Sequence, residues 1–150
     1  MRHGILTLGV ALLLSTGSAI ASDTPKVVAL DPRLEAQADG SRELVIDARI
    51  EPGWILYASD FEQPQIGPRA ARVTLADPAQ PHGPLRSVDA REGHGRSFAG
   101  DYRYTYFSER GQLRLPVAAG STPVTGTLRA QVCFEQSGLC ELVQQEIAAR

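Results

Sequence analysis

Two cysteines, Cys133 and Cys140, are the residues whose type and spacing could support chemistry in this chain. They are its only cysteines, and six residues separate them. The run 127–132 alternates apolar and polar residues before the pair, the run 141–147 follows it, and a Ser-Gly turn signal lies between the cysteines. This pattern predicts a β-hairpin with one cysteine beside the loop on each strand. Opposed residues of an antiparallel pair have Cα atoms about 4.5–5.5 Å apart, which a disulfide can span, so we expect a bond at a loop tip and not deep in a core.

Such a bond has two possible roles, and the residues alone leave both open. In secreted domains a cysteine pair is commonly structural. The loop that this pair closes is short, however. The chain-entropy model assigns about 2.5 kcal/mol to a loop of roughly eight residues, against ~4.7 kcal/mol for a loop of about 100 residues. An accessible pair at a hairpin tip also suits thiol–disulfide exchange, in which a thiolate must reach one of the two sulfurs.

The charged residues near the cysteines bear on how reactive their thiols are. Between Arg129 and Arg150 there is no Lys, Arg or His, whereas Glu135, Glu141 and Glu146 are acidic. Basic neighbours normally favour the reactive thiolate. We therefore expect a sluggish thiol in the isolated protein, activated by a partner or by the opening of a covering loop. Iodoacetamide labelling against pH tests this, and a clear thiolate at about pH 6 would contradict it.

The N-terminus predicts export. Arg2 and His3 precede an apolar run at 5–14, and a small-x-small cleavage site stands at 19–21. These features are typical of a secretory signal peptide, with a membrane anchor as the alternative. We therefore divide the chain into a signal peptide, 1–21, and a mature domain, 22–150. Export would place the cysteines in an oxidising compartment, where an even number usually means pairing.

The mature chain reads as a succession of short strands separated by Gly, Pro and Asp turn signals. We expect strands at 27–30, 43–50, 54–57, 71–75, 85–88, 102–107 and 113–117, followed by the cysteine hairpin. An Asp-Pro step should end the first strand, and 79–100 should be a long connection apart from the fragment at 85–88. Helical periodicity is absent after the signal peptide. Seven or eight short strands predict an all-β, immunoglobulin-like antiparallel β-sandwich.

Composition and spacing argue against several classes of function. Charges of both signs are scattered over a chain of formal charge −2, so we expect no nucleic-acid partner. His82 and His94 stand in no ligand spacing, and we expect no metal and no other cofactor. The weaker alternative is a carrier of a soft metal that uses Cys133, Cys140 and His94. After removal of the signal peptide we expect no direct membrane insertion.

Four segments together resemble the N-terminal periplasmic domain of the DsbD thiol:disulfide interchange proteins. They are the strand Gly-Trp-Ile-Leu-Tyr at 53–57, the motif Phe-Ala-Gly at 98–100, the strand at 113–117, and the cysteine hairpin at 132–140 with its Gly-Leu-Cys ending. Each motif is short, and their order and spacing carry the resemblance, which covers nearly the whole mature chain.

The resemblance implies an immunoglobulin-like domain with a redox-active cysteine pair in the periplasm. Cys133 and Cys140 would be the exchanging pair, Phe98 the cap that shields them, and Tyr57 a neighbour. The domain would take electrons from a membrane-bound or thioredoxin-like donor. It would pass them to periplasmic thioredoxin-fold proteins, such as disulfide isomerases and cytochrome c maturation reductants. An enzymatic role as a protein-disulfide reductase is left open.

The sequence also departs from that family's pattern. Six residues separate the cysteines where the family has five, and Leu142-Val143 replaces the Pro-Pro that usually follows the second cysteine. The segment 102–107 is enlarged. The sequence shows no membrane or thioredoxin domain, so we expect a separate electron donor. The alternative function is a non-catalytic secreted β-sandwich that binds partners and carries a structural disulfide.

Overall fold

The computed structural model describes residues 26–120 and 123–150, and within them ten strands form the fold. The strands are β1 (Val28–Ala36), β2 (Arg42–Ile50), β3 (Trp54–Tyr57), β4 (Arg72–Leu75), β5 (Arg86–Val88), β6 (Arg91–Ser97), β7 (Gly100–Ser108), β8 (Arg110–Val117), β9 (Val124–Phe134) and β10 (Cys140–Ala149). The described residues contain no helix that is long and apolar enough to cross a membrane. The predicted signal peptide, 1–21, lies outside the described residues.

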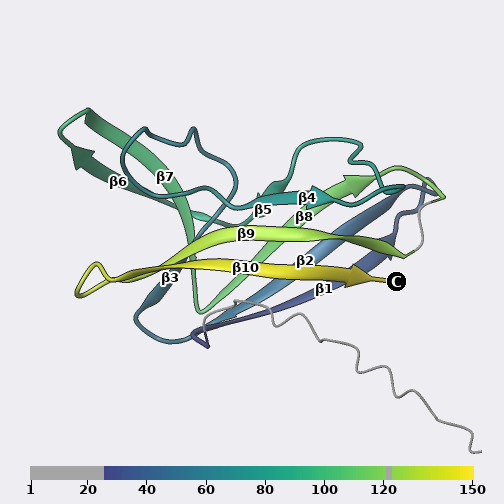
Figure 1. The fold of residues 1–150 in the computed structure, drawn as a ribbon, viewed down its shortest axis with the longest axis horizontal. Coiled ribbons are helices and arrows are strands. Elements are labelled where there is room, and N and C mark those ends of the chain that lie inside the picture. The colour runs from purple at the N-terminus through teal and green to yellow at the C-terminus, as the bar shows by residue number, and fades with distance from the viewer. Residues whose placement is uncertain (1–25, 121–122) are drawn as a thin grey trace, which may run out of the picture.

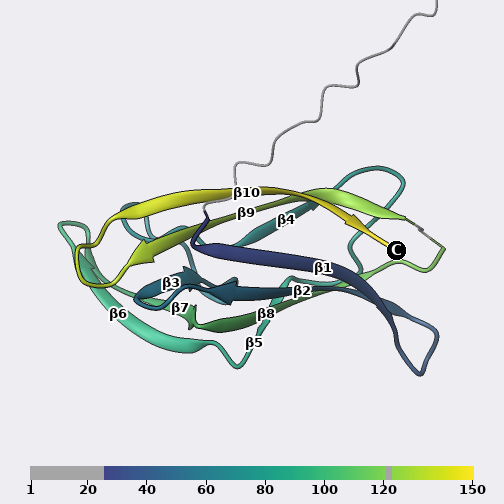
Figure 2. The same ribbon diagram turned by 90° about the horizontal axis from the view of Figure 1, so that it is seen from below.

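The strands form an immunoglobulin-like antiparallel β-sandwich, as the sequence predicts (Figure 1). They pair in the order β1-β2-β8-β7-β3-β9-β10, while β4 pairs with β9, β5 with β8 and β6 with β7. Figure 2 shows the two layers edge-on, with β4, β9 and β10 in one and β1, β2 and β8 in the other. Strand β3 pairs with both β7 and β9 and so connects the layers.

The core lies between these layers and is built by the alternation of apolar residues. Fully buried side chains from one layer include Leu44, Ile46 and Leu113, and those from the other include Leu128 and Val132. In each strand these residues occur at every second position, which places them all on one face. The alternate residues of each strand lie on the outer faces of the two layers. The cysteines lie on the outer face of the layer that contains β9 and β10.

The first strand is longer than predicted. We expected an Asp-Pro step to end it, but Asp31 and Pro32 lie inside β1 and pair with Asp47 and Ile46. A proline removes a backbone donor, which a strand tolerates at the edge of a sheet. Strand β1 stands at the end of the pairing order and has β2 as its only strand neighbour there. The prediction is wrong because the sequence does not show that β1 is an edge strand, where a proline is tolerated.

The prediction of a long connection at 79–100 is wrong from residue 91 onward. Residues Arg91–Ser97 form β6, which pairs with β7 in a long hairpin. Gly93 and Gly95 lie opposite Tyr104 and Tyr102, and a Cβ added at either glycine would stand 2.4 or 2.3 Å from the facing ring. The tyrosine rings therefore lie across the glycines. In the sequence these glycines indicate a loop. In the structure they belong to a strand, and their lack of a Cβ leaves room for the tyrosine rings.

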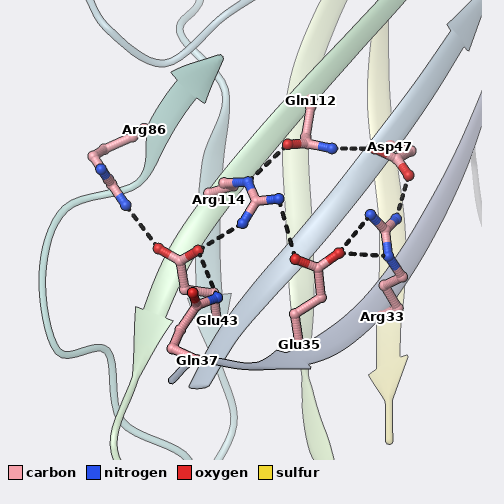
Figure 3. Close-up of polar contacts among 8 residues, drawn as sticks. All are labelled: Arg33, Glu35, Gln37, Glu43, Asp47, Arg86, Gln112 and Arg114. Atoms are coloured by element: carbon pink, nitrogen blue, oxygen red, sulfur yellow. Dashed lines mark hydrogen bonds and ion pairs between the residues drawn. The ribbon is translucent and has the colours of Figure 1, made fainter. Parts of the chain in front are cut away.

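A charged network covers the outer face of β1, β2 and β8 (Figure 3). Val45 is completely buried on this face, between Arg33 of β1 and Arg114 of β8 in the register. Long arginine stems can cover apolar surface while their charged ends reach polar partners. Arg114 donates to Glu43 at 2.8 Å and to Glu35 at 3.1 Å. The network thus shields Val45 from water on the outer face of this layer.

Two further groups extend the network. Arg86 donates to the other oxygen of Glu43 at 2.7 Å, so this largely buried carboxylate has a guanidinium on each side. Asp47 accepts from Gln112 at 2.8 Å and pairs with Arg33. Burial opposes ionisation of Asp47, but these two hydrogen bonds and the positive charges of Arg33 and Arg114 together outweigh it and hold the pKa of Asp47 below its usual value. The resulting stability is present at neutral pH and is lost as the pH falls through that lowered pKa.

Candidate functional site

The two cysteines face each other in the β9–β10 hairpin and form a disulfide. Cys133 pairs with Cys140 in the register, their Cα atoms are 4.1 Å apart, and the sulfurs are bonded at 1.99 Å. The loop is closed by hydrogen bonds from the Phe134 amide to the Leu139 carbonyl at 2.8 Å and from the Gly138 amide to the Phe134 carbonyl at 2.9 Å. Gly138 takes a left-handed conformation, φ 69°, which glycine adopts at little cost. The hairpin predicted from the sequence is confirmed.

The residue after Cys133 anchors the hairpin to the rest of the fold. The ring of Phe134 lies 5.5 Å from that of Trp54, centroid to centroid. It also covers Gly53, where an added Cβ would stand 2.7 Å from the ring. The Glu135 amide donates to the Gly53 carbonyl at 2.9 Å. The Gly-Trp part of the strand motif at 53–57 thus positions the disulfide.

The two cysteines differ in accessibility. Cys133 is 4% exposed and lies opposite Ile55 of β3, itself buried, whereas Cys140 is exposed at the start of β10. The expectation of two accessible thiols at a loop tip is therefore right for Cys140 and wrong for Cys133. The reason is that β9 lies between β3 and β10, so its residues are flanked on both sides, while β10 ends the pairing order. Cys140 is therefore the cysteine that is open to solvent.

Tyrosines occupy the sheet face to which Cys133 belongs. Tyr57 follows Ile55 by two positions on β3, which puts it on the same face as Cys133 and roughly 7 Å further along the strand than Ile55. Its ring contacts Tyr104 at 5.3 Å and Phe61 at 6.4 Å between centroids. Burial, helped by Tyr104 and Tyr102, raises the pKa of Tyr57 to about 12. Its phenol is neutral at physiological pH and gives this face an apolar surface with hydroxyl donors.

Tyr57 should make the domain sensitive to alkali. An unfolded tyrosine ionises near pH 10, while the folded one keeps its proton to about 12, so stability falls as the pH rises between these values. By about pH 11 one of the two units is lost, which corresponds to at most ~1.4 kcal/mol and which half-burial reduces to roughly 0.7 kcal/mol. Urea midpoints at about pH 8 and about pH 11 measure this loss, and Tyr57→Phe should remove it. Phe61→Leu, a packing control with no phenol, should keep it; an equal loss in the Tyr57→Phe variant would contradict the assignment.

Phe98 lies at the tip of the β6–β7 hairpin, in the two-residue turn between Ser97 and Gly100. Its side chain is 90% exposed, so in this structure it does not pack over the disulfide. The β6–β7 and β9–β10 hairpins do lie at the same end of the molecule, as both ribbon views show (Figures 1 and 2). The structure thus places Phe98 at the same end as the cysteines without contact, and its role as a cap stays a prediction.

Two exposed leucines flank Cys140. Leu139 precedes it and is 58% exposed, and Leu142 follows it on the same face of β10 and is 61% exposed. Sequence reasoning gave neither a role in a site. The available signal was the period of two: Val143 points into the core, so its neighbour Leu142 must point out. These leucines give Cys140 an exposed apolar neighbour on each side.

In the ranges 26–120 and 123–150, no three His, Cys, Asp or Glu side chains come together to hold a metal ion. The soft-metal alternative built on Cys133, Cys140 and His94 gains no support, because His94 lies on β6 opposite Arg103 and the cysteines are bonded to each other.

The fold and the site define a class: an immunoglobulin-like β-sandwich domain that carries a disulfide across a hairpin at one end. The family described as "Thiol:disulfide interchange protein DsbD, N-terminal" matches residues 24–150. The chain therefore belongs to the family of DsbD N-terminal domains, which confirms the resemblance seen in the sequence.

Solved structures show the same fold. The reduced DsbD n-terminal domain of Neisseria meningitidis is 24% identical with a TM-score of 0.55, and the match covers 80% of this chain and 83% of that one. The N-terminal periplasmic domain of ScsB from Proteus mirabilis is 13% identical with a TM-score of 0.56, and the match covers 83% of this chain and 46% of that one. No curated protein matches the sequence.

Proposed function

We propose that this domain is a periplasmic thiol:disulfide exchange module whose redox-active pair is Cys133 and Cys140. The observation that carries the proposal is the asymmetry of the disulfide, in which Cys140 is exposed and Cys133 is only 4% exposed within the same hairpin. Membership in the DsbD N-terminal family supports it. Exchange requires one sulfur that a partner can attack and a second that can leave and later return.

The exposure of Cys140 supports the following order of events. A partner thiolate attacks Sγ of Cys140, the Cys133–Cys140 bond breaks, and Cys133 leaves as a thiolate that takes up a proton. The second thiolate of the same partner then attacks the partner sulfur that is bonded to Cys140, and Cys140 is released as a thiolate that takes up a proton. Two electrons have moved from the partner dithiol, which becomes a disulfide, to the domain, which becomes a dithiol. The reverse sequence, begun by the Cys140 thiolate, reduces an oxidised partner.

The partners that we propose are those of the DsbD resemblance. A membrane-bound or thioredoxin-like donor would reduce the pair, and periplasmic thioredoxin-fold proteins would reoxidise it. Leu139 and Leu142, both exposed beside Cys140, suit contact with a protein surface more than with a small hydrophilic thiol.

The reduction potential of the pair tests the function. Purified mature domain is equilibrated in glutathione and dithiothreitol buffers, and the oxidised fraction is measured. We expect a value of about −200 to −250 mV, within the range of known exchange proteins. A value well below about −300 mV, with folding lost on reduction, would identify a structural disulfide and support the alternative of a non-catalytic interaction protein.

We also propose that Phe98 shields the disulfide when the β6–β7 hairpin bends toward it. Among the described strands β6 pairs only with β7, and covering an exposed Phe ring is favourable by roughly 2 kcal/mol. Phe98→Ala should therefore speed reduction by dithiothreitol about five-fold, equivalent to a cap worth about 1 kcal/mol. Val88→Ala, which trims an exposed apolar residue elsewhere, is the control. An unchanged rate would remove Phe98 from the cap role.

A further inference from the structure

Three arginines converge on a groove in the outer face of the β4–β9–β10 layer, the face toward the viewer in Figure 1. We call it the arginine groove and define it by Arg69, Arg72 and Arg129, with Leu142 and Gln144 on its β10 side. Its volume is about 480 Å³. The described residues that line it include no carboxylate, and no described carboxylate forms an ion pair with these three arginines.

The strand register forces two of these charges together. Arg72 of β4 lies directly opposite Arg129 of β9. Both are exposed, and like charges directly opposite each other destabilise a sheet. Glu146, the acid on that face of β10, accepts from the Thr127 hydroxyl at 3.2 Å and keeps its charge, so it offsets at most one of the three arginines. Arg129 donates to Gln144 at 3.3 Å, which is a neutral partner. The groove therefore keeps a surplus of positive charge that an anionic partner would relieve.

A second pair of directly opposed arginines has carboxylates beside it that offset its charge. Arg49 of β2 lies opposite Arg110 of β8. The groove that contains them is also lined by Asp31 and Asp47, so carboxylates stand beside the guanidinium groups. The arginine groove has no such acids among its described lining residues, and this difference marks it as a binding surface.

The arginine groove lies on the same sheet face as the disulfide. Cys140, Leu142 and Gln144 alternate along β10, opposite Cys133, Gln131 and Arg129 of β9. Four positions separate Cys133 from Arg129, which is roughly 13 Å along a strand. The Gln131 side chain accepts from the Arg69 amide at 2.8 Å and ties that loop to this face. A protein bound at Cys140 would thus extend over Leu142 to the arginines.

We propose that the arginine groove docks a protein partner that carries acidic side chains about 13 Å from its reactive cysteine. The inference rests on the proposed function and adds that the partner is acidic where it contacts the arginine groove. The hairpin itself is acidic at Glu135 and Glu141, so the surface is negative beside the disulfide and positive beyond Leu142. A partner of the opposite polarity is oriented as it approaches, because complementary charges steer encounter.

Two synthetic thiol peptides test the inference. Each has one cysteine, and four residues from it one has a run of glutamates and the other a run of lysines. The oxidised domain is mixed with each peptide, and mixed disulfide at Cys140 is followed by mass spectrometry. We expect the glutamate peptide to react about ten-fold faster at low ionic strength, and the ratio to approach one in high salt.

Charge-reversal variants locate the effect. Arg72→Glu combined with Arg129→Glu should reverse the order of the two peptides. Arg49→Glu combined with Arg110→Glu, the other opposed pair, changes the charge equally and should preserve the order. Equal rates for both peptides, or an equal effect of the two double variants, would overturn the inference.

Two further measurements separate this inference from the proposed function. If neither peptide reacts, exchange itself fails, and fluorescent peptides with serine in place of cysteine then measure docking alone. Preferred binding of the glutamate peptide supports the groove, and equal binding refutes it. An oligonucleotide of matched charge that binds more tightly than the glutamate peptide would also overturn a protein partner in favour of nucleic acid.

Discussion

Replacing Cys133 with serine should leave a thiol at Cys140 that iodoacetamide labels at least about 100-fold faster than it labels the Cys133 thiol left by Cys140→Ser. The reason is access: Cys140 is exposed, while Cys133 is 4% exposed opposite Ile55. Iodoacetamide is uncharged, so the acidic and basic regions of this surface do not steer its approach, and labelling over a range of pH separates access from the thiolate fraction of each cysteine. The rates are measured by mass spectrometry of the intact variants.

The same pair of variants should differ in trapping partners. Cys133→Ser lacks the sulfur that would return to resolve the mixed disulfide, so it should accumulate a covalent complex with an oxidised thioredoxin-fold protein. Cys140→Ser should not. In concentrated urea both variants should label at similar rates, which ascribes the difference to folding. Equal rates in the folded state, or faster labelling of Cys133, would contradict the assignment of Cys140 as the attacked sulfur.

Removing Arg114 should cause the largest loss of stability among the charged residues. Arg114→Ala leaves Glu43 with Arg86 as its remaining guanidinium partner, deletes the ion pair to Glu35, and uncovers Val45. Breaking a fully buried ion pair costs about 3–5 kcal/mol. Since the Arg114 side chain is 25% exposed and that of Glu43 12%, we expect a loss of about 2 kcal/mol. Urea unfolding at neutral pH measures it.

An exposed ion pair provides the matched control. Arg96 and Asp101 pair on the β6–β7 hairpin with side chains 80% and 69% exposed. Water screens such a pair, so Arg96→Ala should leave the urea midpoint unchanged. Arg114→Lys should fall between the wild type and Arg114→Ala, because it keeps the charge and most of the stem but loses the forked contacts. The interpretation fails if Arg114→Ala is no more destabilising than Arg96→Ala.

The cysteine hairpin shows what local sequence determines. The alternation at 127–132, the Ser-Gly turn and the six-residue spacing place Cys133 opposite Cys140, and the structure has that register. Alternation in β2 likewise places Leu44 and Ile46 in the core. These predictions succeed because a strand's inward face and a hairpin's register depend on neighbours a few residues away.

Long-range packing determines the remaining features, and the sequence by itself could not supply them. The Gly-rich segment Arg91–Ser97 becomes a strand because tyrosines of β7 fold over its glycines. Tertiary structure also decides which cysteine is buried, since Cys133 is flanked by β3, nearly 80 positions earlier in the chain, while Cys140 starts the strand that ends the pairing order. The arginine groove arises in the same way from the pairing of β4 with β9.

The sequence by itself therefore determined the immunoglobulin-like class, the disulfide and its place in a hairpin. Only the tertiary structure decided the exposure of each cysteine, the exposure of Phe98 and the charge of the surface beyond Leu142. The physical reason is that local patterns set which face of a strand is apolar, whereas accessibility and charge depend on which strands lie beside it.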